Sequence, residues 1–210
     1  MATIDAVVEC LPWTGDVSPW PIVESTDKFI RLYAATSFEN VGRVMLQLAM
    51  SCGVESFLSA DAVLKAIMAE PTWILPGGLR AQDVTGSTIA PSCCCGLEDW
   101  REWLDFLNNG QSPFLGHDPS QGIERSGNRI RVVSFPSHGS EYYIEFDPDD
   151  FTEQLRQVQD DLKQFLVVLK NWTLLRFDFA PGEDFVARFD EMFEINRAGS
   201  KPVIKTVIET

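Results

Sequence analysis

The sequence predicts an α+β fold in which a small antiparallel sheet packs against several amphipathic helices. Helical periodicity lies before and after one cluster of three short strand-like segments, whereas a parallel α/β fold would alternate helices with strands. Apolar residues make up 45% of the 210 residues, enough to form a sizeable core. We expect one α+β domain over residues 1–200, followed by a tail over residues 201–210.

The first part of the chain predicts extended segments and then a helical hairpin. Prolines and glycines recur through residues 1–33, which favours turns and extended backbone over helix. After Ser37, apolar residues follow at three- and four-residue spacing until Gly53, as on the buried face of a helix. A second helix with one apolar face is predicted between Ser59 and Pro71.

The middle of the chain predicts one more helix and the three strands. Residues 71–91 are rich in proline and glycine and are interpreted as loop or irregular strand. A helix is expected over 97–109, with Gly110 as its stop. A turn able to supply positive φ separates 122–125 from 129–135, which indicates a β-hairpin, and the alternating residues 141–146 predict a third strand.

The longest predicted element is a helix that begins after Asp147 and Pro148, a cap and a first-turn proline. Its apolar stripe has the spacing of a buried helix face. The stripe consists of Phe151, Leu155, Val158, Leu162, Phe165, Leu169 and Trp172. A final amphipathic helix is expected over 183–195.

The unusual chemistry of the sequence lies between Ser92 and Pro119. Three consecutive cysteines precede Gly-Leu-Glu-Asp-Trp-Arg-Glu-Trp, and a Gly-His-Asp-Pro segment follows. Over roughly Leu75 to Val133, the chain resembles bacterial proteins of uncharacterised function that share a Cys-Cys-Cys-Gly-Leu-Glu-x-Trp-x-x-Trp helix and a Gly-His-Asp-Pro turn. This resemblance indicates a type of protein but implies no activity.

One hypothesis for this segment is a small thiol-dependent enzyme or ligand-binding protein. A thiol before a helix can be activated by the helix N-terminus, and a nearby histidine and carboxylate would complete the site. The candidate residues are Cys93, Cys94, Cys95, His117 and Asp118. Against this hypothesis, the acids of the first helical turns disfavour a thiolate, and adjacent histidine and aspartate side chains usually diverge.

Metal binding is a further alternative, with two of the cysteines joined by His117 and either His138 or Asp118. In extended backbone, alternate residues point to opposite sides, so only Cys93 and Cys95 would face one ion. We therefore expect no metal and no other cofactor. The expected structure is a tight turn of buried, inert cysteines packed under the neighbouring tryptophans.

The charge of the chain favours a basic protein partner. The formal net charge is −14, which repels nucleic acid and anionic lipid, so neither is expected as a partner. Several carboxylates gather on the predicted long helix and form the candidate partner-binding residues Asp149, Asp150, Glu153, Asp160 and Asp161. Since common enzyme motifs are missing, the leading hypothesis is a protein-interaction protein, comparable in charge and size to immunity proteins.

The N-terminal residues lack the basic cluster of a secretory signal, and no apolar run is long enough to span a membrane. The odd number of cysteines, 5, favours reduced thiols. We therefore expect a cytoplasmic protein.

Overall fold

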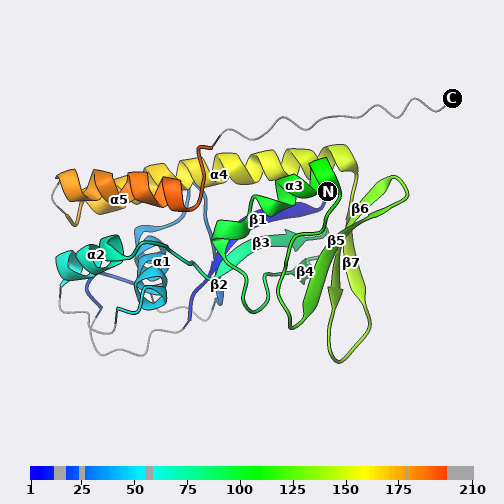
Figure 1. The fold of residues 1–210 in the computed structure, drawn as a ribbon, viewed down its shortest axis with the longest axis horizontal. Helices are drawn as coiled ribbons and strands as arrows, with labels where there is room; N and C mark the ends of the chain where they lie inside the picture. Colours follow the sequence, from blue (N-terminus) through cyan, green and yellow to red (C-terminus); the bar gives the residue numbers. More distant parts are fainter. Residues whose placement is uncertain (12–17, 24–26, 55–58, 178, 198–210) are drawn as a thin grey trace.

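Two antiparallel sheets and five α-helices form the described part of the chain in this computed structural model (Figure 1). The structure describes residues 1–11, 18–23, 27–54, 59–177 and 179–197, so the tail predicted over 201–210 lies outside the described residues. The predicted α+β class is confirmed. None of the described helices is both long and apolar enough to cross a membrane.

The first sheet contains four strands in the order β2 (Phe29–Arg31), β1 (Thr3–Glu9), β3 (Gly77–Gln82) and β4 (Thr88–Ile89). This sheet was not predicted, because the sequence indicated a single cluster of three strands. Glycine weakens the strand pattern of β3, yet Gly77 is required there. A Cβ at Gly77 would lie 2.2 Å from the backbone oxygen of Val7 on the neighbouring strand.

The second sheet contains β5 (Ser120–Ser126), β6 (Arg129–Phe135) and β7 (Tyr142–Phe146), paired in that order. Ser126 pairs with Arg129 in the register, so Gly127 and Asn128 form a two-residue turn. Gly127 has φ +61°, the left-handed conformation that such turns require. The predicted hairpin and third strand are therefore confirmed.

Helices α1 (Phe38–Ser51) and α2 (Ala60–Ala69) confirm the predicted hairpin of helices. Each helix has a serine N-cap: the hydroxyl of Ser37 accepts a hydrogen bond from the backbone N–H of Asn40, at 3.3 Å, and Ser59 caps α2 in the same way.

Helix α4 (Pro148–Leu174) runs along one side of the molecule and contacts β1, β6, α1, α3 and α5 (Figure 1). Its predicted stripe is buried at every position, and Leu162 and Phe165 are fully buried. Helix α5 (Phe179–Met192) lies beside it and begins four residues earlier than the sequence suggested. Asp147 occupies the N-cap position, but its carboxylate forms an ion pair with Arg129 instead of capping the helix.

The helix expected over 97–109 is divided into a short 3-10 turn, Leu97–Asp99, and helix α3 (Glu102–Asn109). The residues at the break bind the end of α5. The indole N–H of Trp100 donates to the carbonyl oxygen of Phe193 at 2.8 Å, and Nε of Arg101 donates to the carbonyl oxygen of Glu194 at 2.7 Å. These two contacts fix the segment that follows the cysteines against the core.

Candidate functional site

The three cysteines lie on a turn between β4 and the 3-10 segment. The backbone N–H of Cys95 donates to the carbonyl oxygen of Ser92, which makes Cys93 and Cys94 the two central residues of the turn. Cys94 has φ +66°, the left-handed conformation found at the third residue of a type II turn and uncommon for residues other than glycine. The Cys93 and Cys94 side chains are both exposed as a result of this turn.

The turn is anchored to the core on its C-terminal side. The carbonyl oxygen of Cys95 accepts a hydrogen bond from Gly77 on β3, at 3.1 Å, and the Leu97 N–H donates to the carbonyl oxygen of Leu75 at 2.8 Å. The Glu98 carboxylate accepts from the Leu75 N–H. Burial raises the pKa of Glu98 above its ordinary value.

His117 is carried by a second segment, which leads from α3 to β5 and is pressed against the cysteine turn. The buried hydroxyl of Ser92 donates to the carbonyl oxygen of Leu115 at 2.9 Å. Gly116 has φ +97°, and a Cβ there would lie 1.9 Å from the Ser92 hydroxyl and 2.6 Å from the carbonyl oxygen of Cys93. Only glycine allows so close an approach of the two segments.

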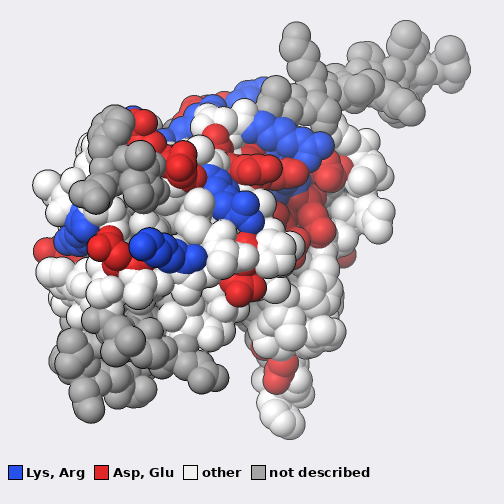
Figure 2. Space-filling view, turned by 60° about the vertical axis from the view of Figure 1, so that its left-hand side comes forward, with Lys and Arg blue, Asp and Glu red and all other residues white. Residues whose placement is uncertain are grey.

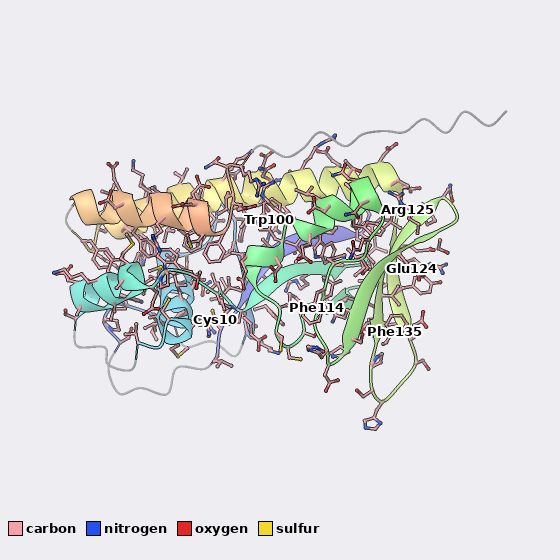
Figure 3. All side chains as sticks on the ribbon, viewed as in Figure 1. Cys10, Trp100, Phe114, Glu124, Arg125 and Phe135 are labelled. Atoms are coloured by element: carbon pink, nitrogen blue, oxygen red, sulfur yellow. The ribbon has the colours of Figure 1, made fainter. Side chains whose placement is uncertain are left out.

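The Phe114 ring limits the orientation of the imidazole. The rings of Phe114 and His117 meet edge to face with their centroids 5.0 Å apart. Phe114 lies on the segment that leads to His117 (Figure 3).

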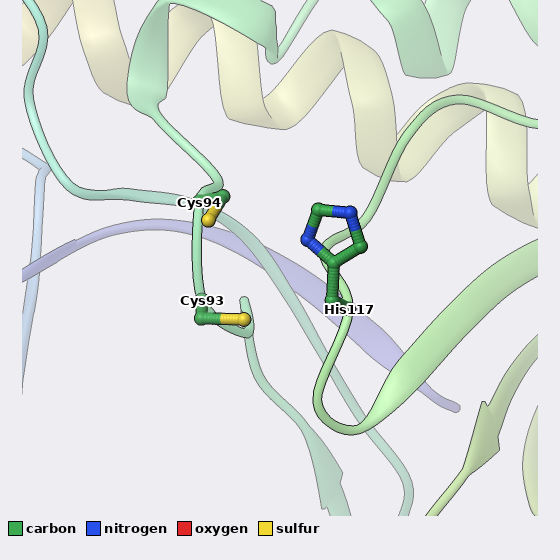
Figure 4. A group of neighbouring side chains, drawn as sticks. All are labelled: Cys93, Cys94 and His117. Carbon is green, nitrogen blue, oxygen red and sulfur yellow. The ribbon is translucent and has the colours of Figure 1, made fainter.

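Cys93, Cys94 and His117 converge on one point at the surface (Figure 4). One ligand atom from each, two thiol sulfurs and one imidazole nitrogen, lie within 4.8 Å of one another, and all three residues are exposed. We call this group the Cys-Cys-His cluster. Among the described residues, these three form the group whose potential ligand atoms are close enough to bind one metal ion.

The cysteines differ in their ease of ionisation. Hydrogen bonds from the backbone N–H groups of His117 and then Asp118 hold the pKa of the Cys93 thiol below its ordinary value. Burial raises the pKa of Cys95 to about 11, of Cys52 to about 11 and of Cys10 to about 12. Cys93 is therefore the thiol whose surroundings favour the thiolate.

These findings correct the expectation of buried, inert cysteines. Cys93 and Cys94 are exposed, so their sulfurs are not buried beneath Trp100 and Trp103, whereas Cys95 is half-buried. The pair that faces one point is Cys93 with Cys94, and not Cys93 with Cys95, because the left-handed residue breaks the alternation of extended backbone. The acids of the following helix do not decide the pKa of Cys93, which the backbone N–H groups of His117 and Asp118 lower.

The remaining candidates of this region lie outside the cluster. The Asp118 carboxylate accepts a hydrogen bond from the Ser137 hydroxyl at 3.1 Å, which agrees with the expected divergence of His117 and Asp118. His138 is exposed in the loop between β6 and β7 and is not a member of the cluster. Cys95 borders a small pocket of about 20 Å³ beside Gly78 and Trp100, with room for about one water molecule.

The predicted acidic face of α4 is smaller than the sequence suggested. Asp149, Glu153 and Asp160 are exposed and Asp150 is half-buried, but Asp161 is buried. Glu153 forms an ion pair with Arg156 at 3.1 Å, and Asp160 forms one with Lys163 at 3.0 Å. Basic and acidic side chains are intermingled on the face seen in Figure 2.

Asp161 has a structural environment that corrects its assignment to the partner-binding surface. Its carboxylate accepts hydrogen bonds from Arg31 on β2 and from Gln157, both at 2.8 Å. Arg31 also pairs with the buried Asp5 of β1 at 3.0 Å, and Asp5 pairs with Arg80 of β3. Asp161 therefore joins α4 to the first sheet.

Comparison with known proteins gives no relative for this chain: no protein family, no curated protein and no solved structure matches it. The resemblance to uncharacterised bacterial proteins stays a prediction. The geometry of the described residues is therefore the basis for assigning a function.

Proposed function

We propose that this chain is a ligand-binding protein that works through the Cys-Cys-His cluster and takes a small, thiophilic ligand. The observation that carries the proposal is the convergence of Cys93, Cys94 and His117 at the surface, within 4.8 Å. Buried structural cysteines pack as small apolar side chains. These two thiols do not, and instead form a pair next to an imidazole.

The backbone of the cluster supports a binding role. A non-glycine residue in the left-handed region costs about 1 to 2 kcal/mol relative to the ordinary conformation. The chain holds Cys94 in that region, and the result is that its sulfur lies beside that of Cys93. Strain of this kind is common at functional sites.

The pocket that borders Cys95 is too small for an organic substrate. The pocket next to Cys95 has a volume of about 20 Å³, far below the roughly 300 to 1,000 Å³ of pockets that hold drug-sized molecules. A single ion or small electrophile needs no such cavity, because the sulfur and nitrogen atoms themselves form the site.

A trivalent organic arsenical tests the proposal, because one arsenic atom forms bonds to two neighbouring thiols. The oxygen of the As=O group takes the two thiol protons and leaves as water, while the arsenic forms one bond to each sulfur. We expect the reduced chain to bind one equivalent, and Cys94→Gly to lose this binding. Cys52→Ala is the matched control and should bind as the parent does, because Cys52 lies at the end of α1.

The proposal would be wrong if the parent bound no arsenical, or if Cys94→Gly bound as much as the parent. Cys94→Gly is a suitable variant because glycine adopts φ +66° without strain. Loss of binding in this variant therefore reflects the missing sulfur and not unfolding, which its unfolding midpoint would verify.

Binding of a basic protein partner, comparable to the action of an immunity protein, is the second candidate. Its support is the exposed row of Asp149, Glu153 and Asp160 on one side of α4, together with the net charge of −14. Replacing these three acids by their amides should slow association with a basic partner captured from the native host and should flatten its salt dependence. Unchanged rates and salt response would remove this candidate.

We also propose that the chain acts in the cytoplasm. The support is chemical: the described cysteines, Cys10, Cys52, Cys93, Cys94 and Cys95, are all unpaired, and a reducing compartment keeps exposed thiols in this form. Spontaneous loss of the exposed thiols in an oxidising buffer, measured by thiol counting, would agree with this location. Resistance to oxidation would argue against it.

A further inference from the structure

We propose that the ligand of the Cys-Cys-His cluster is a divalent cation of the zinc class, bound by Sγ of Cys93, Sγ of Cys94 and one imidazole nitrogen of His117. This inference rests on the proposed function and names its ligand. The three groups are the donor types that zinc binds most often in proteins. Two thiolates balance the charge of the cation, and their protons pass to the solvent when it binds.

The distances between the ligand atoms of the cluster are close to those of a tetrahedral zinc site. With bonds of about 2.3 Å to sulfur and about 2.0 Å to nitrogen, ligand atoms of a tetrahedral zinc lie about 3.5 to 3.8 Å apart. The ligand atoms of the cluster lie within 4.8 Å of one another. Closing a gap of about 1 Å requires only side-chain rotation, and the three residues that would rotate are exposed.

The backbone beneath the ligands is already fixed. The Ser92 hydroxyl joins the cysteine turn to Leu115, Gly116 allows the two segments to touch, and Cys95 is bound to β3. Metal sites depend on such supporting contacts, whose loss typically weakens metal binding about 10- to 100-fold. The cation would therefore meet ligands whose main chains do not need to move.

The number of protein ligands indicates an accessible site. Structural zinc usually has four protein ligands, whereas three leave one position for water or an exchangeable ligand. Asp118 is adjacent in sequence, but its carboxylate is engaged by Ser137. The exposed position of the cluster lets an exogenous donor reach the fourth position, as expected for a protein that receives or delivers its metal.

Titration of the reduced full-length chain with Co²⁺ tests this inference, because cobalt reports thiolate ligation by a near-ultraviolet charge-transfer band. We expect one equivalent of Co²⁺ to bind with this band and one equivalent of Zn²⁺ to displace it. His117→Ala and Cys94→Gly should each weaken binding by at least about 100-fold, more than loss of a supporting contact. His138→Ala removes the other histidine of the chain and should bind as the parent does.

Three results would overturn the inference: a parent without the charge-transfer band, a His117→Ala variant with the affinity of the parent, or a Cys94→Gly variant with the affinity of the parent. The arsenical experiment separates this failure from failure of the proposed function. If the arsenical binds the two thiols but Co²⁺ and Zn²⁺ do not bind, the zinc assignment is wrong and the thiol site remains. If neither binds, both proposals are wrong.

Discussion

Replacement of Gly116 by alanine should separate the two segments that form the cluster. Gly116 has φ +97°, and the new Cβ would lie 1.9 Å from the Ser92 hydroxyl and 2.6 Å from the backbone oxygen of Cys93. The left-handed backbone costs alanine about 1 to 2 kcal/mol. Overpacking against backbone adds about 1 to 3 kcal/mol. The expected loss of unfolding free energy is therefore about 2 to 5 kcal/mol.

Gly86→Ala is the matched control for this prediction. Gly86 has a similar φ of +92°, but a Cβ there would meet nothing within 4 Å. Its expected loss of unfolding free energy comes from the left-handed backbone alone and is about 1 to 2 kcal/mol. The difference between the two variants, measured by urea unfolding, isolates the clash between the segments.

The Gly116→Ala variant should also bind the arsenical normally but Co²⁺ weakly, because the two cysteines share one turn whereas His117 lies on the displaced segment. A Gly116→Ala variant that lost no more stability than Gly86→Ala would contradict the predicted clash. Equal stability would mean that the two segments are not pressed together.

Three further predictions concern the core and the ion pairs. Leu162→Ala should lower the unfolding free energy by about 2 to 5 kcal/mol, since the side chain is fully buried, and an unchanged urea midpoint would contradict its place in the core. Asp161→Asn should lower the unfolding free energy by about 1.5 to 3 kcal/mol, because it weakens the contact of the buried Asp161 with Arg31. Asp160→Asn should lower it by less than about 0.5 kcal/mol, because Asp160 forms an exposed ion pair. Similar losses for the two variants would contradict the difference between the two environments. Because burial raises the pKa of Cys10 from 9.0 to about 12, its contribution to stability is complete below pH 9 and is lost as the pH rises toward 12. At pH 10 the loss is about 1.4 kcal/mol, so Cys10→Ala should flatten the alkaline decline measured by urea unfolding, and parallel pH profiles would disagree with a buried thiol.

Local patterns in the sequence predicted much of the fold because they have local causes. Ser37 and Ser59 cap helices, Gly127 forms a hairpin turn, and the apolar stripe of α4 is buried. The four-stranded sheet was missed because Gly77 and Gly78 interrupt the pattern of β3. Their role depends on how closely β1 approaches, which is a tertiary property.

The sequence identified residues of the candidate site but not how they are arranged in space. Cys93, Cys94 and His117 were among the candidates, whereas the pairing of the sulfurs depends on the left-handed backbone of Cys94. Ser92 and Gly116, which hold the segments together, were not recognised as site residues. The glycine before the histidine was the available signal, since a glycine beside a polar turn often marks a close backbone approach.

For the acidic residues of α4, the sequence grouped side chains that the structure separates. Asp160 and Asp161 are adjacent in sequence and were assigned to one surface, but successive helical residues point about 100° apart. Asp160 is exposed, and Asp161 turns toward the first sheet and binds Arg31. Charge counting alone does not separate the two positions.

The zinc-loaded chain allows the most direct test of the metal ligands. X-ray absorption at the zinc edge of the full chain with one equivalent of Zn²⁺ reports the atoms bound to the metal. The structure predicts two sulfur atoms at about 2.3 Å and one imidazole nitrogen at about 2.0 to 2.1 Å, with a light atom completing the site. A first shell of oxygen and nitrogen atoms without sulfur would contradict the assignment of Cys93, Cys94 and His117 as the functional centre.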